Sequence, residues 1–245
     1  MTAPRTSISA DAAGLADQAA DAFISRLLSI QGSGSDPSVV LTGGGIADEI
    51  HHRIATHQRG SGVAWDRIDF FWGDERFVAA DSPDRNEGQA RAALLDQLPV
   101  DPARLHPMPA EAGAYTGHPE AAAAAYASEL QAVLGDRPFD IVMLGVGPDG
   151  HCASLFPGQD QVLATAPVVV VPESPKPPPV RLSLTLPRLS HADVVWFVAS
   201  GRSKAAAVAA ALDPDAEPLQ VPSAGPRGRK ETLWFLDQDS ASSLS

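Results

Sequence analysis

The stretch from Phe139 to Gly158 constrains the fold of this chain more than any other. It begins with a short continuous apolar segment, Ile141 to Leu144, of the kind found in central parallel strands covered on both faces. Glycine and proline then interrupt regular structure, and His151 follows directly. In open α/β sheets, ligands bind at the carboxyl ends of the strands. The stretch therefore predicts a buried strand that leads into an active-site turn containing a histidine, with a further helix beginning near Ala153.

Strands and helices alternate along the whole chain, with short connections. Apolar periodicity predicts helices over 11–30, 46–54, 87–98, 119–134 and 204–212, and strands over 39–41, 65–72, 139–144, 168–171, 180–184, 194–199 and 233–236. This alternation predicts a single α/β domain over residues 1–245 with a doubly wound, mostly parallel sheet. We expect residues 1–9 and 238–245 to be frayed.

A glycine turn follows the strand over 39–41. Thr42, Gly43, Gly44 and Gly45 lead directly into a helix, and a helix amino terminus with free N–H groups is suited to bind phosphate. A plain tight turn is the alternative. The turn does not form a Walker A loop, and a dinucleotide fingerprint would place Asp48 where its third glycine belongs.

Charged side chains gather after two other strands. Asp74, Glu75 and Arg76 follow the apolar strand over 65–72, and they indicate either a site or a solvated loop with an internal ion pair. Lys204 begins a helix just after a strand and a turn, where a cation could meet an anion. The chain has only three lysines, so a lysine at a strand end draws attention.

Composition narrows the possible partners. The formal net charge of −12 argues against general attraction to nucleic acid or to an anionic membrane surface, so an anionic substrate needs local cations. The only cysteine, Cys152, excludes an intramolecular disulfide and fits a reducing cytoplasm. We also expect neither a signal peptide nor a membrane span.

Common catalytic motifs of other classes are missing. The histidines form no HExxH or other metal-ligand spacing, and the G-x-S-x-G elbow of serine hydrolases is absent. Cys152 lies beside His151, but neighbours in sequence usually point apart, so we interpret it as a packing residue. The residues that remain for catalysis are a histidine, acidic neighbours and cations, so we expect a site without metal or cofactor.

Five ordered segments resemble the motifs of the 6-phosphogluconolactonase family. They are LTGGG (41–45), WGDERFV (72–78), GVGPDGHCASLFPG (145–158), RLSLTLP (181–187) and 222–237, which ends in LWFLD. The resemblance implies a three-layer α/β/α fold and the hydrolysis of 6-phospho-D-glucono-1,5-lactone to 6-phosphogluconate in the oxidative pentose phosphate pathway.

The resemblance also implies roles for individual residues. His151 would be the general base and later the acid, while Asp149 and Asp74 would orient it or the substrate. The implied substrate-binding residues are Gly43, Gly44, Gly45, Arg76, Arg181 and Lys204, with Arg85 as a weaker candidate. Gly45 and Ile46 stand where the family often has serine and threonine, which leaves backbone N–H groups to contact the phosphate.

Two other functions compete with this one. The related glucosamine-6-phosphate deaminases carry a motif like GHIAFNEP, but Ser154, Leu155, Phe156 and Pro157 replace the part that holds its acidic residue. A sugar-phosphate sensor of the type fused to DNA-binding repressors would need a helix-turn-helix segment, for which this chain has no spare length.

Overall fold

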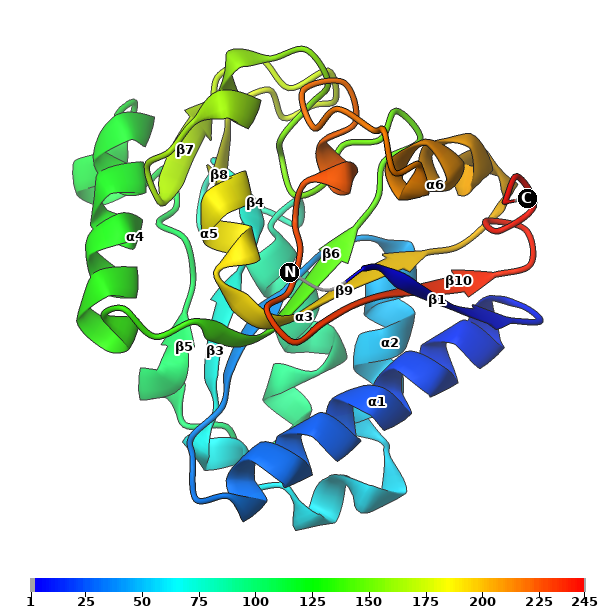
Figure 1. The fold of residues 1–245 in the computed structure, drawn as a ribbon. Helices are drawn as coiled ribbons and strands as arrows, with labels where there is room; N and C mark the ends of the chain where they lie inside the picture. Colours follow the sequence, from blue (N-terminus) through cyan, green and yellow to red (C-terminus); the bar gives the residue numbers. More distant parts are fainter. Residues whose placement is uncertain (1–2, 245) are drawn as a thin grey trace.

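The computed structural model describes residues 3–244 and contains a central sheet of seven parallel strands (Figure 1). The strand order is β1-β10-β9-β6-β2-β3-β5, and every pairing between neighbours is parallel. This confirms the predicted α/β sheet. The strands are β1 (Arg5–Ser9), β2 (Ser38–Leu41), β3 (Asp69–Trp72), β5 (Leu105–His106), β6 (Phe139–Gly145), β9 (Ala192–Ala199) and β10 (Glu231–Asp237).

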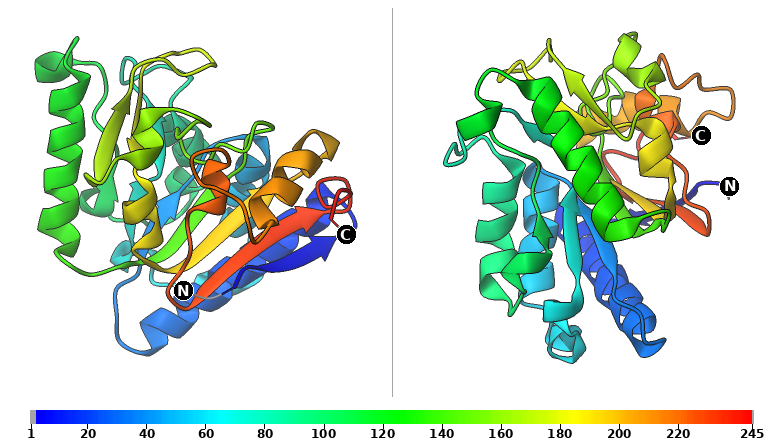
Figure 2. Two further views of the ribbon diagram at one scale, coloured as in Figure 1. Left: turned by 45° about the horizontal axis from the view of Figure 1, so that its top comes forward. Right: turned by 90° about the vertical axis from the view of Figure 1, so that its left-hand side faces the viewer.

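Two layers cover the sheet, one on each face (Figure 2). Helices α1 (Ala12–Gly32), α2 (Gly45–Ala55) and α3 (Asn86–Ala93) pack on one face. The other face carries α4 (Pro119–Leu134), α5 (Leu186–Ser190), α6 (Ala205–Leu212) and a small antiparallel sheet. The strand order of that sheet is β4-β8-β7, and its strands are β4 (Asp74–Arg76), β7 (Val168–Val171) and β8 (Arg181–Leu184).

Strand β6 occupies the centre of the large sheet and contributes to both hydrophobic cores. Val142 and Leu144 pack into the core under α4, whereas Ile141 and Met143 pack into the core under α1 and α2. Successive side chains of a strand point to opposite faces, so a strand covered on both sides needs apolar residues at every position. This explains the continuous apolar run.

The sheet has a topological switch point between β2 and β6. From β2 the chain proceeds outward through β3 to β5, and from β6 it proceeds the other way through β9 to β10. The loops that follow β2 and β6 therefore diverge and leave a crevice at the carboxyl edge of the sheet. This edge is where the sequence places its glycine turn and its histidine.

Both chain ends are more ordered than predicted. Residues 5–9 form strand β1 against β10, and the hydroxyl of Ser240 donates a hydrogen bond of 2.7 Å to the main-chain oxygen of Ala199. The prediction of frayed ends is thus wrong for 5–9 and for the segment around Ser240, because pairing with β10 and β9 fixes both. Residues 1–2 and 245 lie outside the described residues.

Four further expectations differ from the structure. The strand predicted over 65–72 begins at Asp69, because Trp65–Arg67 forms a 3-10 turn. No helix begins at Ala153, because this residue has a φ of 47° and the chain forms a tight bridge between Cys152 and Leu155. The strands over 168–171 and 180–184 exist, but they belong to the small antiparallel sheet. The helix predicted over 87–98 ends at Ala93, followed by a short 3-10 turn.

Within residues 3–244, no helix has the length and apolar content needed to cross a membrane.

Candidate active site

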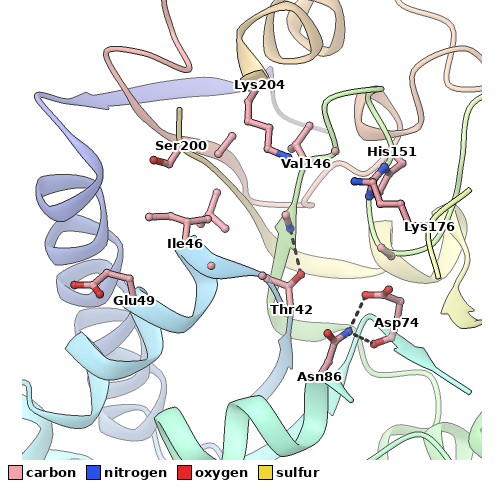
Figure 3. A pocket seen from close by; sticks show the side chains of 18 of the residues that line it. Thr42, Ile46, Glu49, Asp74, Asn86, Val146, His151, Lys176, Ser200 and Lys204 are labelled. Carbon is pink, nitrogen blue, oxygen red and sulfur yellow. Dashed lines mark hydrogen bonds between the residues drawn. The ribbon is translucent and has the colours of Figure 1, made fainter. Parts of the chain in front are cut away.

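A cavity of about 740 Å³ opens at the carboxyl edge of the sheet, beside the switch point (Figure 3). Residues that follow β2, β3, β6 and β9 line it, as expected for a parallel sheet. All predicted site residues except Asp149 are part of the lining: Gly43, Gly44, Gly45, Asp74, Arg76, His151, Arg181 and Lys204.

His151 and Asp149 form a hydrogen-bonded pair in the turn after β6. The Nδ1 atom of His151 lies 2.5 Å from Oδ1 of Asp149. Burial raises the pKa of Asp149, but the hydrogen bond and the charge of His151 outweigh it and lower this pKa to about 2. The ionised carboxylate accepts the proton on Nδ1, which leaves Nε2 with a free lone pair.

Glycine is required beside this pair. A Cβ atom on Gly147 would lie 2.0 Å from Nδ1 of His151 and 2.3 Å from Oδ1 of Asp149. The His151 ring also packs against Phe156, with ring centroids 4.7 Å apart. The turn thus holds the imidazole in one place through its own backbone and one aromatic contact.

Asp74 is a buried carboxylate that faces the cavity from the start of β4. The hydroxyl of Ser154 donates a hydrogen bond of 2.6 Å to its Oδ2 atom. Asn86 donates from Nδ2 to the main-chain oxygen of Asp74 at 2.9 Å and to the Oδ1 atom of its carboxylate at 3.5 Å. These contacts fix the carboxylate from two distant parts of the chain.

Glu75 does not belong to the site. It is fully buried, and its carboxylate accepts hydrogen bonds from the main-chain N–H groups of Asn86 at 2.7 Å and Glu87 at 2.9 Å. Burial raises the pKa of Glu75, although Arg85 and these N–H groups act in the opposite direction. Neighbours on a strand point to opposite sides, so Glu75 caps α3 while Asp74 and Arg76 face the cavity.

The glycine turn lies against Asn86 and forms one wall of the cavity. A Cβ atom on Gly43 would lie only 2.1 Å from Oδ1 of Asn86, so a larger residue fits there only if the Asn86 side chain moves. Gly44 has a φ of 107°, a conformation that glycine adopts readily. The turn brings the amino terminus of α2 to the cavity, as predicted for an anion site.

Arg76, Arg181 and Lys204 provide positive charge from three elements. Lys204 lies in the turn between β9 and α6. This turn is held by Asp237, whose carboxylate accepts hydrogen bonds from the Ser200 hydroxyl at 2.5 Å and from the Gly201 N–H at 3.0 Å. The closing strand β10 therefore positions Lys204 indirectly.

Arg85, the weaker candidate, lies outside the cavity lining. Its side chain is only 2% exposed and donates hydrogen bonds to Glu87 at 3.0 Å and to the main-chain oxygen of Met108 at 2.7 Å. Its contacts are to the protein, and they link α3 to the segment around Met108.

Cys152 is fully buried, and burial raises the pKa of its thiol, in agreement with a packing role. The described part of the chain contains no group of three or more His, Cys, Asp or Glu residues able to hold a metal ion.

Comparison with known proteins identifies the family. The family model described as glucosamine-6-phosphate isomerases/6-phosphogluconolactonase matches residues 10–234. The chain belongs to this family. The 6-phosphogluconolactonase of Streptomyces coelicolor is 45% identical over an alignment of 248 residues, which covers 98% of this chain and 95% of that protein. The 6-phosphogluconolactonase of Mycobacterium tuberculosis is 44% identical over 211 residues, 84% of each chain.

Solved structures agree with this assignment to the glucosamine-6-phosphate isomerase/6-phosphogluconolactonase family. The 6-phosphogluconolactonase of Trypanosoma brucei has a TM-score of 0.84 and 27% identity, with 99% of both chains covered. A monomeric glucosamine-6-phosphate deaminase has a TM-score of 0.81 over 99% of this chain at 18% identity, a level that shows the shared fold alone. The predicted family and fold are confirmed.

Several polar residues of the cavity were not predicted from the sequence as site residues. Lys176, Asn86, Thr42 and Ser200 all line it, and Ser154 contacts Asp74 behind it. Lys176 carried a usable signal, since it is one of only three lysines. The others are common polar residues in loops, and only the fold brings them to the cavity.

Proposed function

We propose that this chain hydrolyses 6-phospho-D-glucono-1,5-lactone to 6-phosphogluconate in the oxidative pentose phosphate pathway, as a single catalytic domain without metal or cofactor. The activity named for its relatives supports this. The net charge of −12 argues against nucleic acid as a partner, and a single buried cysteine fits a reducing cytoplasm.

His151 acts as the general base in this reaction. Its Nε2 atom takes a proton from water while the water oxygen forms a bond to the lactone carbonyl carbon. The carboxylate of Asp149 keeps the proton on Nδ1 and stabilises the imidazolium that forms. When the bond between this carbon and the ring oxygen breaks, His151 returns the proton to the ring oxygen, which becomes a hydroxyl. Asp74 orients the substrate from the opposite wall.

The phosphate binds where the free N–H groups of the glycine turn meet the cations. The amino terminus of α2, from Gly43 to Gly45, supplies backbone donors, while Arg76, Arg181 and Lys204 supply charge. The strongly acidic chain gathers these cations around one cavity, which favours an anionic substrate.

The observation that carries the proposal is the 2.5 Å contact between Asp149 and His151, whose side chain lines a cavity together with Arg76, Arg181 and Lys204. The test is to add the purified protein to freshly made lactone and to follow acid release after correction for spontaneous opening. We expect rapid hydrolysis by the wild type and a loss of about 10²- to 10⁴-fold in kcat for His151→Ala. A His151→Ala protein within threefold of the wild type would refute the role of His151.

The same purified protein can be tested for glucosamine-6-phosphate deaminase activity. Glucosamine 6-phosphate should release no ammonia, because Ser154 to Pro157 stand where the deaminase motif carries its acidic residue. Ammonia release at a rate comparable with lactone hydrolysis would instead favour the deaminase.

A further inference from the structure

Two of the three lysines line the same cavity without a carboxylate partner. Lys230 is paired with Asp193 at 2.5 Å. Lys176 and Lys204 both line the cavity, and within residues 3–244 neither has an acidic side chain within 4 Å of its ammonium group. In a chain with 30 acidic and 18 basic residues, unpaired lysines that converge on one cavity are unexpected. They indicate a ligand that supplies the negative charge.

Lys176 belongs to a proline-rich loop, 172–180, which connects β7 to β8. Five of its nine residues are proline, which fixes φ and limits the motion of the loop. The loop is also closed on itself, since the N–H of Ser174 donates to the main-chain oxygen of Pro179 at 2.8 Å. The side chain of Gln159 anchors it from outside through a hydrogen bond of 3.1 Å to the main-chain oxygen of Glu173.

Arg181 ties this loop to the cavity wall. Its Nε atom donates to the main-chain oxygen of Pro178 at 2.9 Å, and its Nη2 atom donates to that of Lys176 at 3.1 Å. A guanidinium group has five N–H donors, so Nη1 remains available for a ligand. Arg181 is 5% exposed, and its position at the start of β8 is set by pairing with Arg76 of β4. The loop therefore presents Lys176 from a fixed point.

The charges of the two lysines are coupled. Burial lowers the pKa of Lys204, the charge of Lys176 lowers it further, and Asp149 acts in the opposite direction. Two ammonium groups that share a cavity repel each other until an anion lies between them. A dianionic phosphate removes this repulsion and accepts a charge-assisted hydrogen bond from each lysine.

We propose that Lys176 is a further substrate-binding residue, which holds the substrate phosphate together with Lys204, and that Arg181 positions the loop that presents it. This inference rests on the proposed function, because it assigns Lys176 to the phosphate of the same substrate. Arg181 then has two roles, because its guanidinium group both donates hydrogen bonds to the loop and contacts the phosphate.

The first test compares Lys176→Ala with Lys230→Ala, a lysine variant outside the site. For Lys176→Ala we expect KM for the phosphorylated lactone to rise about tenfold or more and kcat to stay within about threefold. Hydrolysis of unphosphorylated glucono-1,5-lactone should not change. Lys176→Arg should recover part of the affinity. A Lys176→Ala protein with the KM of the Lys230→Ala control would overturn the proposal.

The second test measures the coupling between Lys176 and Arg181 by a double-mutant cycle. If Arg181 positions the loop, Lys176→Ala should raise KM about tenfold in the wild type but less than about threefold in the Arg181→Ala background. An equal increase in both backgrounds would refute the positioning role of Arg181.

Binding of 6-phosphogluconate, measured by titration calorimetry, separates this inference from the proposed function. It reports on Lys176 without turnover, and we expect Lys176→Ala to weaken it about tenfold or more. A wild type that binds 6-phosphogluconate but does not accelerate lactone opening would refute the activity alone. Unchanged product affinity in Lys176→Ala would refute the role of Lys176 even in an active enzyme.

Discussion

The hydroxyl of Ser154 donates a hydrogen bond of 2.6 Å to Oδ2 of Asp74, although the two residues lie 80 positions apart in the chain. Both are buried, Asp74 in the lining of the cavity and Ser154 behind it. Through this bond, the turn that carries His151 fixes the carboxylate that faces the imidazole across the substrate space. Ser154 thus helps to set the placement of the two groups relative to each other.

We therefore expect Ser154→Ala to lower kcat/KM for the phosphorylated lactone by about tenfold. Loss of a hydrogen bond to a charged group costs about 1.5–3 kcal/mol, and the buried carboxylate would be free to rotate. Ser128→Ala is a matched control, because the Ser128 hydroxyl contacts only its own helix at an exposed position. Equal activity of the two variants would show that Ser154 does not position Asp74.

Gly43→Ala should disturb the same carboxylate from the other side. The new Cβ atom would lie 2.1 Å from Oδ1 of Asn86, so the Asn86 side chain must move and lose its hydrogen bonds to the main-chain oxygen and the Oδ1 atom of Asp74. We expect kcat/KM to fall at least tenfold. Gly88→Ala in α3 is the control, because a Cβ atom there meets nothing within 4 Å. Wild-type kinetics of Gly43→Ala would contradict this account of the turn.

The fold could be predicted where local pattern determines structure. The apolar run of β6 and the glycines before His151 were sufficient to predict a buried strand and a ligand turn. The small antiparallel sheet could not be predicted, because Arg76 pairs with Arg181 more than a hundred positions away and periodicity does not encode partner or direction. Strand β1 was missed for a similar reason, since its sequence is polar and only β10 orders it.

The site could be predicted where a residue sits in a motif. Asp149 and His151 are two positions apart, and their contact follows from one turn. Ser154 and Asn86 could not be assigned, because their contacts to Asp74 exist only after the strands assemble. The scarcity of lysine could have singled out Lys176, but only the hydrogen bonds from Arg181 to its proline-rich loop show that it faces the cavity.

Removal of metal ions should leave activity unchanged. Residues 3–244 provide no cluster of three or more His, Cys, Asp or Glu side chains suited to a metal, and His151 is already bound to a carboxylate. We expect prolonged dialysis against EDTA to preserve kcat/KM. Loss of activity that returns on addition of zinc or magnesium would show that a metal takes part.

Asp149→Asn should lower the rate of the chemical step. The pKa of Asp149 is lowered to about 2, so its carboxylate is ionised at neutral pH and stabilises the imidazolium that forms in the transition state. An amide removes that charge. We expect kcat to fall by about 10²-fold or more, with KM within about threefold of the wild type. The measurement is kcat and KM for the variant and the wild type at neutral pH, and an unchanged kcat would contradict this role of the carboxylate.

Protein stability should fall in the alkaline range because of His106. Its ring lies between Asp69, with Nε2 3.0 Å from Oδ1, and Glu129, with Nδ1 2.9 Å from Oε1. Burial lowers the pKa of His106, but these two carboxylates outweigh burial and raise it to about 9. A folded-state pKa above the unfolded value of 6.5 means that the protonated form stabilises the fold fully below pH 6.5. This contribution is lost as pH rises from 6.5 through 9.

The rise in the pKa of His106 from 6.5 to about 9 would contribute at most about 3 kcal/mol to the unfolding free energy. Solvent screening at the partly exposed Glu129 makes the contribution smaller. Urea unfolding at pH 6.5 and pH 9 measures it in the wild type and in His106→Gln. We expect the glutamine variant to be less stable at both pH values, because it loses the stacking of His106 on Phe71, whose ring centroids lie 4.5 Å apart. Its unfolding free energy should nevertheless change less between the two pH values, since glutamine does not titrate. Equal pH dependence in both proteins would show that His106 is not the titrating group.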